Sequence, residues 1–272
     1  DLKNIITVDM GGTSFDITLT RDGRANVSKN IDFLRYRIGI PMIQVETLGA
    51  GGGSIGWIDS MGLMQMGPQS AGSEPGPACY QRGGVHPAIT DADLVLGKID
   101  ADNFAGGAIK LSAADASGAI VRDVGGKLGL GAEAAAFGIC EVVDENMANA
   151  ARVHAVENGK NISDNMMIAF GGAAPLHAAR LCEKLGIERC LIPVGAGVGS
   201  AIGFLKAPFG YEALASNILR LSAFEAGAAN TLLARLTATA EGFVRAGTEV
   251  AITREITAFM RYVGQGWEIP VA

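Results

Sequence analysis

The 272-residue sequence has few of the residues that build metal centres and no block of positive charge. It contains 3 histidines and 4 cysteines, and the cysteines form no C-x-x-C pair. Such spacing argues against a protein-held zinc or manganese site and against a disulfide framework. The formal net charge is −6. Without a basic patch, nucleic acid is not expected as a partner.

Long hydrophobic runs are also missing. No run reaches the roughly 18 apolar residues of a membrane span, and no charged and apolar leader opens the chain. We therefore expect no membrane association and a cytoplasmic protein. Hydrophobic residues make up 49% of the sequence, enough for the core of one large or two modest domains. The chain opens at Asp1 inside a strand-like segment and stops in one, so we expect a piece of a longer subunit.

Glycine, by contrast, is abundant, and its 38 residues are clustered. In the first cluster two β-branched segments flank Gly11-Gly12, with Asp9 before the pair and Thr13 and Asp16 after it. Glycines let backbone N–H groups turn toward an anion, which makes a concavity for phosphate. Asp9 would repel phosphate, so we assign it to Mg²⁺ or a magnesium-bound water. The alternative is a plain hairpin with a Gly-Gly turn.

A second cluster, Gly51-Gly52-Gly53 followed by Ser54, is flanked by apolar residues and lacks the repetition of a flexible linker. We expect a functional loop there, one that contacts ligand or packs against another lobe. Residues 67–77 contain three prolines and several glycines, so we expect a long rigid loop rather than helix or central strand.

Helical periodicity dominates the middle of the chain. Ser112 is a predicted helix N-cap, a long helix is predicted over 132–157, and another over 222–247. Thr90 or Asp91 is a predicted N-cap of a short helix that ends at Gly97, with Asp93 as a first-turn acid. Packing within helices is the expected role of the two helical histidines. Further predicted elements are a strand-like segment over 27–36, a small-residue helix over 195–203 that packs against another helix, and a hairpin over 250–271.

The segment 166–192 reads as strand, glycine turn, helix and strand, which predicts a right-handed crossover between parallel strands. Gly171 and Gly172 precede a helix with Pro175 in its first turn. Their N–H groups would lie at a helix N-terminus, where phosphate or a nucleoside can approach closely. The segment is not G-x-G-x-x-G, so it is not a dinucleotide fingerprint.

Five motifs occur together in an order that resembles the hydantoinase A / 5-oxoprolinase family, from residue 1 to about residue 210. They are Asp9-Met-Gly-Gly-Thr-Ser with Phe15-Asp16, Gly49-Ala-Gly-Gly-Gly-Ser-Ile, Pro75-Gly-Pro-Ala-Cys-Tyr, Thr90-Asp-Ala-Asp-Leu-Val-Leu-Gly and Phe170-Gly-Gly-Ala-Ala-Pro-Leu-His-Ala. No single glycine motif is specific, whereas the five together are. The family includes ATP-dependent hydantoinases, 5-oxoprolinase and related subunits of acetone and acetophenone carboxylases.

The resemblance implies the α/β fold of the actin/Hsp70/sugar-kinase (ribonuclease H-like) ATPases. The opening hairpin then matches the second phosphate motif, Gly171-Gly172 the adenosine motif, and residues 197–203 the helix that connects two lobes. The family's first phosphate motif has no counterpart here, so we expect a core over 1–210, a further segment over 211–272, and lobes incomplete at both ends. A chain without that motif should bind ATP poorly.

By the same resemblance the expected cofactors are ATP and Mg²⁺. Asp9 would hold the metal through water, Thr13 would contact phosphate, and Asp16 would support the hairpin or the metal's outer shell. The glycines expected at the nucleotide, with one serine, are Gly11, Gly12, Gly51, Gly52, Gly53, Ser54, Gly171 and Gly172. Asp91 is a further candidate for ligand contact.

The implied reaction is ATP-driven opening of a cyclic amide, with phosphorylation of the amide oxygen before water attacks. A hydantoinase B-type subunit and the missing N-terminal part of the same subunit are the expected partners. Two alternatives stay open: the ATP-handling subunit of an acetone or acetophenone carboxylase, and a non-catalytic actin-like nucleotide-binding module.

Overall fold

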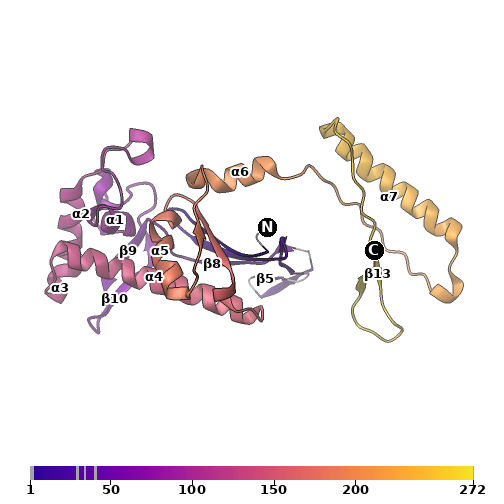
Figure 1. The fold of residues 1–272 in the computed structure, drawn as a ribbon, viewed down its shortest axis with the longest axis horizontal. Coiled ribbons are helices and arrows are strands. Elements are labelled where there is room, and N and C mark those ends of the chain that lie inside the picture. The colour runs from indigo at the N-terminus through magenta and orange to yellow at the C-terminus, as the bar shows by residue number, and fades with distance from the viewer. Residues whose placement is uncertain (1–2, 29–30, 34, 40–41, 272) are drawn as a thin grey trace. The chain divides into compact units, whose positions relative to one another are not determined.

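The computed structural model describes residues 3–28, 31–33, 35–39 and 42–271 (Figure 1). The chain divides into two compact units, Asp1–Leu205 and Lys206–Ala272. Each unit is described by itself.

A mixed sheet forms the centre of the first unit. Its strand order is β12-β11-β1-β2-β3. Strand β8 pairs with the same edge of β2 as β3 does, β8 along the first residues of β2 and β3 along the last two. β1 runs antiparallel to β2 and parallel to β11, and β11 runs parallel to β12. The strands are β1 (Asn4–Met10), β2 (Phe15–Arg21), β3 (Arg24–Ala25), β8 (Val45–Leu48), β11 (Met166–Phe170) and β12 (Cys190–Leu191).

Alternation along the first two strands decides which face of the sheet is buried. Every second side chain of the hairpin points into the core and is at most 1% exposed: Ile6, Val8, Met10, Phe15, Ile17 and Leu19. Burying each large apolar side chain contributes about 1.5–3 kcal/mol. A slip of one residue would turn this whole set outward, so the burial pattern fixes the register of the hairpin.

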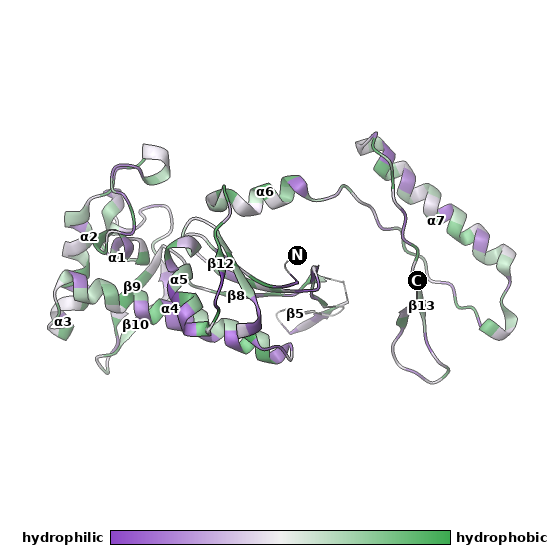
Figure 2. Cartoon of the chain, viewed as in Figure 1, coloured by the Kyte–Doolittle hydropathy of each residue, from purple (hydrophilic) through white to green (hydrophobic). Residues whose placement is uncertain are grey.

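Helices α4 (Ala132–Glu157) and α5 (Ala174–Leu185) supply the other half of this core. Ile139, Val143 and Met147 recur at helical spacing on the buried stripe of α4. Hydrophobic and hydrophilic residues alternate along α4 in Figure 2. The long helix predicted over 132–157 and the strand–turn–helix–strand order of 166–192 are both confirmed.

A helical region with its own small core follows the second glycine cluster. Cys79, Leu94, Leu111 and Ala116 form that core. The region's elements are β9 (Ser54–Ile58), β10 (Met64–Ser70), 3-10 helices Ala78–Tyr80 and Phe104–Gly107, α1 (Ile89–Val95), α2 (Ala113–Ile120), a π-helical turn Val121–Gly125 and α3 (Gly126–Leu128).

The rigid loop predicted over 67–77 is wrong at its start, because β10 continues to Ser70. The strand is an edge strand of a two-stranded sheet, and its pairing with β9 is irregular between Met66 and Ser70. An edge strand with such an irregularity tolerates Pro68, which has no N–H to donate.

Helix ends follow the predicted chemistry with one exception. Ser112 caps α2 by accepting a hydrogen bond from the Asp115 N–H, and Gly186 ends α5 in the left-handed conformation, both as expected. For α1 the expected caps are wrong, because Ala88 is the N-cap and Thr90 and Asp91 lie inside the helix.

Short pairs of strands lie between β3 and β8: β4 (Val27–Ser28) with β7 (Met42–Ile43), and β5 (Ile31–Phe33) with β6 (Tyr36–Ile38). The strand predicted over 27–36 is therefore divided, and residues 29–30 and 34 lie outside the described residues. Further 3-10 helices span Ile162–Asp164 and Ala196–Val198.

Helix α6 (Gly199–Lys206) follows β12 and has no buried residue. The predicted packing of this small-residue helix against another helix is therefore not made within the described part of the chain. It approaches the rest of the first unit closely at Gly199, where an added Cβ would lie 2.9 Å from the Phe170 side chain, and at Ser200, whose hydroxyl donates to Asp9.

The second unit holds a short 3-10 helix Leu221–Ala223, α7 (Ala226–Gly247), and the antiparallel pair β13 (Ala258–Met260) and β14 (Ile269–Val271). Phe209 and Tyr211 stack on Phe243 of α7 at 5.8 and 4.4 Å between ring centroids. The predicted long helix and terminal hairpin are confirmed. No described helix combines the length and hydropathy that a membrane span requires.

Candidate functional site

Two carboxylates face each other across the opening hairpin. Asp9 on β1 and Asp16 on β2 are directly opposite in the antiparallel register, so both side chains lie on the same face. Like charges in opposite positions destabilise a hairpin. Asp16 accepts hydrogen bonds from Ser14 Oγ at 3.1 Å and Thr47 Oγ1 at 2.6 Å. Asp9 accepts one from the hydroxyl of Ser200 in the first turn of α6. A cation would relieve the repulsion that remains.

The turn between these carboxylates is open to solvent. Gly11 N–H donates to the Ser14 carbonyl at 3.3 Å. Among the described residues, the N–H groups of Gly12 and Thr13 have no protein acceptor, and both residues are exposed. A Cβ built on Gly11 or Gly12 meets nothing within 4 Å. Packing inside the chain therefore does not require glycine here, while the close approach of an anion to free N–H groups would.

The second glycine cluster packs against that turn, and its N–H groups all donate to acceptors within the protein. Gly52 N–H donates to Gly11 O at 3.0 Å and Gly53 N–H to Gly12 O at 2.8 Å. Gly51 N–H donates to Ser54 Oγ at 3.0 Å. A Cβ on Gly51 would collide with the backbone of Gly12 and Thr13. Of the two roles expected for the loop, the described residues show the packing role, against the hairpin of the same unit.

The turn between β11 and α5 approaches the hairpin from its other side. Ala173 N–H donates to Met10 O at 2.8 Å, and Gly171 N–H donates to Ala196 O at 2.8 Å. Gly171 has φ +92°, and a Cβ there would collide with the Asp9 carboxylate and the Met10 carbonyl. Gly172 is exposed, its N–H has no acceptor among the described residues, and a Cβ on it would meet open space.

Two glycine turns thus pack against one hairpin, and the N–H groups of Gly12, Thr13 and Gly172 have no acceptor in the part of the chain that the structure describes. Such a cradle, with carboxylates Asp9 and Asp16 beside it, fits a phosphorylated ligand with its cation. No group of three or more histidine, cysteine or acidic side chains gathers within the described ranges. Mg²⁺ typically takes one or two protein carboxylates and completes its shell with phosphate and water, so two carboxylates are compatible with it.

Asp91 is not available to a ligand. Its buried carboxylate accepts from three backbone N–H groups, those of Ala78 (3.2 Å), Cys79 (2.7 Å) and Ala88 (2.8 Å). Burial raises the pKa of this carboxyl, and the backbone hydrogen bonds oppose that shift. The side chain therefore joins the loop before α1 to the helix, and the expected ligand contact is not supported.

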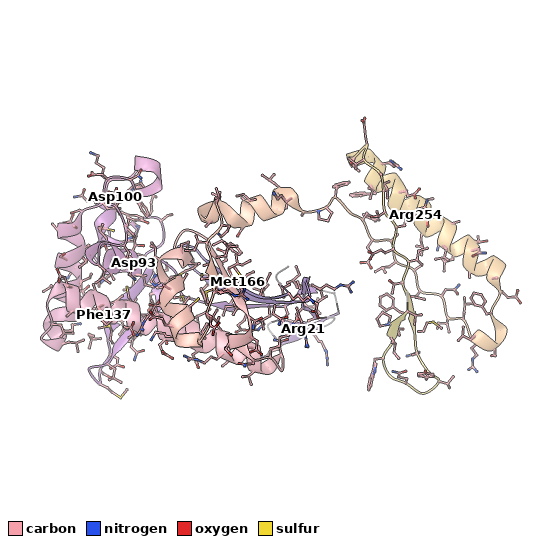
Figure 3. All side chains as sticks on the ribbon, viewed as in Figure 1. Arg21, Asp93, Asp100, Phe137, Met166 and Arg254 are labelled. Atoms are coloured by element: carbon pink, nitrogen blue, oxygen red, sulfur yellow. The ribbon has the colours of Figure 1, made fainter. Side chains whose placement is uncertain are left out.

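A second set of polar residues was missed by sequence reasoning. Asp93, expected as a first-turn acid that favours the helix dipole, is 1% exposed and lies on α1 where that helix meets α4 and α5 (Figure 3). It binds His177 Nε2 at 3.2 Å and Lys98 Nζ at 2.9 Å. His177 Nδ1 binds Asp144 Oδ1 at 2.7 Å, and both residues are buried. The packing role predicted for His177 is confirmed, since its ring is fully buried, and the structure adds that the ring belongs to a buried ionic cluster.

The other two histidines differ from each other. His154 is 1% exposed, and neither ring nitrogen has a hydrogen-bond partner within the described part of the chain. Burial lowers its pKa, so the neutral form is favoured. His154 is thus buried on α4 as expected, but the hydrogen-bond partners expected of a satisfied helix histidine are not found within the described ranges. His86 is exposed and lies 3.0 Å from Asp123.

Sequence alone gave no signal for Ser200, whose partner Asp9 is 191 residues away. For the buried cluster a weak signal existed, because Asp93, Asp144 and His177 each lie one helical turn from buried apolar positions. A polar residue on an apolar stripe of a helix is consistent with a buried, paired group.

Comparisons with known proteins show the family of the chain. A family model described as hydantoinase/oxoprolinase matches residues 1–213. The chain belongs to this family. The α subunit of caprolactamase from Pseudomonas jessenii is 48% identical over 220 residues, covering 81% of this chain and 32% of that subunit. The 5-oxoprolinase of Saccharomyces cerevisiae is 32% identical over 216 residues, covering 75% of this chain and 16% of the relative.

Two solved structures are similar over 99% of this chain. A nucleotide-free structure described under ATP-dependent acetone carboxylation has a TM-score of 0.88 and 30% identity, and this chain covers 40% of it. The ATP-dependent caprolactamase of Pseudomonas jessenii has a TM-score of 0.74 and 42% identity, again with 40% covered. The expected mixed α/β fold of an actin-like ATPase lobe is confirmed at this level. The chain spans about a third of the caprolactamase α subunit.

Proposed function

We propose that this chain is the nucleotide-binding part of a subunit that opens a cyclic amide with ATP. The observation that carries the proposal is the open hairpin turn, where the N–H groups of Gly12, Thr13 and Gly172 have no acceptor among the described residues and the Asp9–Asp16 pair lies on the same hairpin. Two structural relatives whose descriptions name ATP dependence share this fold. A helix N-terminus next to a glycine turn favours phosphate.

Each residue of the site has a proposed role. Asp9 binds the water shell of Mg²⁺, and Asp16, held by Ser14 and Thr47, keeps the opposite side of the hairpin polar. Thr13 donates its N–H and its hydroxyl to a phosphoryl oxygen. Gly11 and Gly12 leave room for that oxygen, and Gly172 leaves room for the nucleoside.

The loop Gly51–Ser54 is proposed to support the hairpin turn without contacting the ligand itself. Its N–H groups hold the carbonyls of Gly11 and Gly12, which aims the N–H groups of the same turn outward. Gly171 similarly fits against Asp9 and fixes the carboxylate's position. In phosphoryl transfer such positioning and charge neutralisation supply most of the rate enhancement.

The chemical need for ATP follows from the substrate. An amide carbonyl is a poor electrophile, and a phosphoryl group on its oxygen makes the carbon open to attack by water. In this chain the hairpin residues would hold and orient the transferred group, while the atoms that bind the ring belong to the rest of the subunit or to a hydantoinase B-type partner. We propose that the enzyme acts in the cytoplasm, where ATP is available.

We favour a cyclic amide as the substrate because the caprolactamase α subunit is 48% identical to this chain over 220 residues. The TM-score of 0.88 to the acetone carboxylase structure favours a second candidate, the ATP-handling subunit of a ketone carboxylase. In that case the phosphoryl acceptor would be the ketone or bicarbonate. The hairpin and its cradle would serve either acceptor, so the site alone does not discriminate between them.

The test is calorimetric titration of Mg·ATP into the full-length subunit, alone and with its partner. Asp9→Ala should weaken binding at least tenfold. Asp22→Ala, at the exposed far end of the same hairpin, should leave it unchanged. Release of ADP and phosphate is then measured with lactams, hydantoins and 5-oxoproline, and separately with ketones plus bicarbonate.

Turnover with a cyclic amide supports the proposal, and turnover only with a ketone and bicarbonate supports the carboxylase. ATP binding without any turnover would favour a non-catalytic actin-like module. If the wild-type subunit does not bind Mg·ATP, the assignment of the hairpin as a phosphate site is wrong.

A further inference from the structure

One buried histidine of the first unit has a carboxylate at each ring nitrogen. His177 Nδ1 lies 2.7 Å from Asp144 Oδ1, and Nε2 lies 3.2 Å from Asp93 Oδ2. The three side chains are 0 to 3% exposed. They belong to α5, α4 and α1 respectively, so one imidazole ring joins three helices.

The two contacts determine the charge of the ring. An ionised carboxylate only accepts, so a histidine between two of them must donate from both nitrogens and carry a positive charge. Lys98 Nζ, 2.9 Å from Asp93 Oδ1, supplies the second cation. Two carboxylates and two cations then balance. Cys140 is the remaining group, with its Sγ 3.4 Å from both Asp93 Oδ1 and Lys98 Nζ.

The cluster closes a circuit of hydrogen bonds that begins and ends at the opening hairpin. From Gly11 O it passes through Gly52 N–H to Gly52 O, which accepts from both the N–H and the hydroxyl of Thr90 at 2.9 Å. Thr90 lies on α1 less than one turn before Asp93. Through His177 the circuit enters α5, and it returns by Ala173 N–H to Met10 O at 2.8 Å.

We propose that His177 is a positioning residue: its doubly bonded imidazolium fixes the start of α5, and so the free Gly172 N–H, relative to the hairpin turn. The inference rests on the proposed function, because the nucleotide is the ligand that would contact both the hairpin turn and the β11–α5 turn and so requires them at a fixed distance. His177 itself is buried and does not touch the ligand. Through this ring α5 is linked to α1, and so to the side of the circuit that carries the second glycine cluster.

Electrostatics support the same arrangement. Burial alone would lower the pKa of His177, but hydrogen bonds to Asp144 and Asp93 raise it to about 9. The pKa of Asp93 is lowered, because His177 and Lys98 outweigh its burial. The charged groups that face the ring are therefore Asp93 and Lys98 from α1 and its end, and Asp144 from α4. The raised pKa of His177 favours the protonated ring near pH 7, and the lowered pKa of Asp93 favours the ionised carboxylate that faces it.

The experiment measures the Kd for Mg·ATP in the full-length subunit carrying His177→Gln, with each protein shown to be folded at the assay temperature. Glutamine is close to the ring in size but carries no charge, and both of its N–H donors are on one nitrogen, so it cannot replace donors at both ring positions. We expect Kd to rise at least tenfold. The matched control is His154→Gln, which alters an equally buried histidine outside the circuit and should leave Kd within about twofold.

A purely structural role would lower the melting temperature of His177→Gln but leave Kd of the folded protein unchanged, and that result would overturn the proposal. The charge-balanced double variant His177→Gln/Asp144→Asn covers the case where the single variant does not fold. It should regain stability without regaining affinity, and recovery of both would equally contradict the positioning role.

Nitrogen NMR of histidine-labelled wild-type subunit, with His177→Gln for assignment, reads the charge separately. Both ring nitrogens of His177 should be protonated from pH 6 to 8, and a single protonated nitrogen would refute the imidazolium. Absence of Mg·ATP binding by wild type would overturn the proposed function and the positioning role together. The NMR result would still stand on its own, so the two failures are distinguishable.

Discussion

At the scale of single residues, neighbouring glycines of the β11–α5 turn have different reasons to be glycine. Gly171 has φ +92° and faces the Asp9 carboxylate, so the folded chain itself excludes a side chain there. Gly172 has open space at its Cβ position. The chain tolerates a side chain at 172, and only a ligand would be displaced by one.

The pair Gly171→Ala and Gly172→Ala separates stability from binding. We expect Gly171→Ala to lower the free energy of unfolding by about 1–3 kcal/mol through strain. Gly172→Ala should change it by less than about 0.5 kcal/mol while weakening Mg·ATP binding. Chemical denaturation and calorimetry of the full-length subunit measure the two effects. Equal affinities of Gly172→Ala and wild type would show that the nucleotide does not approach this turn.

Ser200 is a second residue whose effect should be on the ligand rather than on the fold. It is exposed, and its hydroxyl donates to Asp9. Because groups that orient a metal-binding carboxylate affect affinity by about 10–100-fold, Ser200→Ala should raise the Mg²⁺ concentration that half-saturates ATP hydrolysis by roughly tenfold. Ser200→Thr keeps the hydroxyl and should behave like wild type. An unchanged Mg²⁺ dependence in Ser200→Ala would contradict this role.

At the scale of elements, helix α1 is held by the carboxylate of Asp91, which the sequence pattern predicts to be a helix N-cap. Asp91 accepts from three backbone N–H groups in a fully buried position. Its removal leaves buried donors without acceptors, and each such group costs about 1–3 kcal/mol. The position therefore matters for the stability of the whole helical region.

We expect Asp91→Ala to lower stability by at least about 2–3 kcal/mol without altering the Kd of the folded protein for Mg·ATP. Asp115→Ala is the control, because Asp115 is an exposed first-turn acid of α2 whose main contact is with Gln81 at 3.0 Å. Thermal denaturation and calorimetry give the two quantities. A large loss of affinity in folded Asp91→Ala would restore the direct ligand contact that the structure does not support.

At the scale of the whole molecule, two buried histidines give stability opposite dependences on pH. The folded-state pKa of His177 is raised to about 9, so its contribution is complete below about 6.5 and is lost as pH rises through 9. The pKa of His154 is lowered by burial, so its contribution is complete above about 6.5 and is lost as pH falls.

The melting temperature of the full-length subunit should therefore pass through a maximum near neutral pH. On the alkaline side, the folded-state pKa of His177 of about 9 lies above its unfolded value of about 6.5. At 1.36 kcal/mol per pH unit, the free energy of unfolding should fall by up to about 3 kcal/mol across that interval. His177→Gln should lose the alkaline decline, and His154→Gln should lose part of the acid decline. A profile of His177→Gln parallel to wild type up to pH 9.5 would contradict the assignment.

Local chemistry was enough to predict most elements. The alternation of apolar residues around Gly11-Gly12 defines the hairpin, because only one register of a strand with a period of two places all its apolar side chains on the buried face. The period of 3.6 defines α4, and Ser112 and Gly186 mark helix ends through their own hydrogen bonds or conformation. These features depend on residues within a few positions of one another. Local chemistry failed at residues 67–70, where pairing with β9 overrides the proline and glycine content.

The sequence by itself therefore determined the hairpin with a carboxylate on either side of its glycine pair, the glycine turn before α5, and membership of the family through the order of its motifs. Only the tertiary structure decided that Gly51–Ser54 supports the hairpin, that Ser200 meets Asp9, and that Asp93, Asp144 and His177 form one buried cluster. Contacts between residues 33 to 191 positions apart arise from packing, and no periodicity or cap encodes them. Which charge is buried, and with which partner, is therefore decided by the fold.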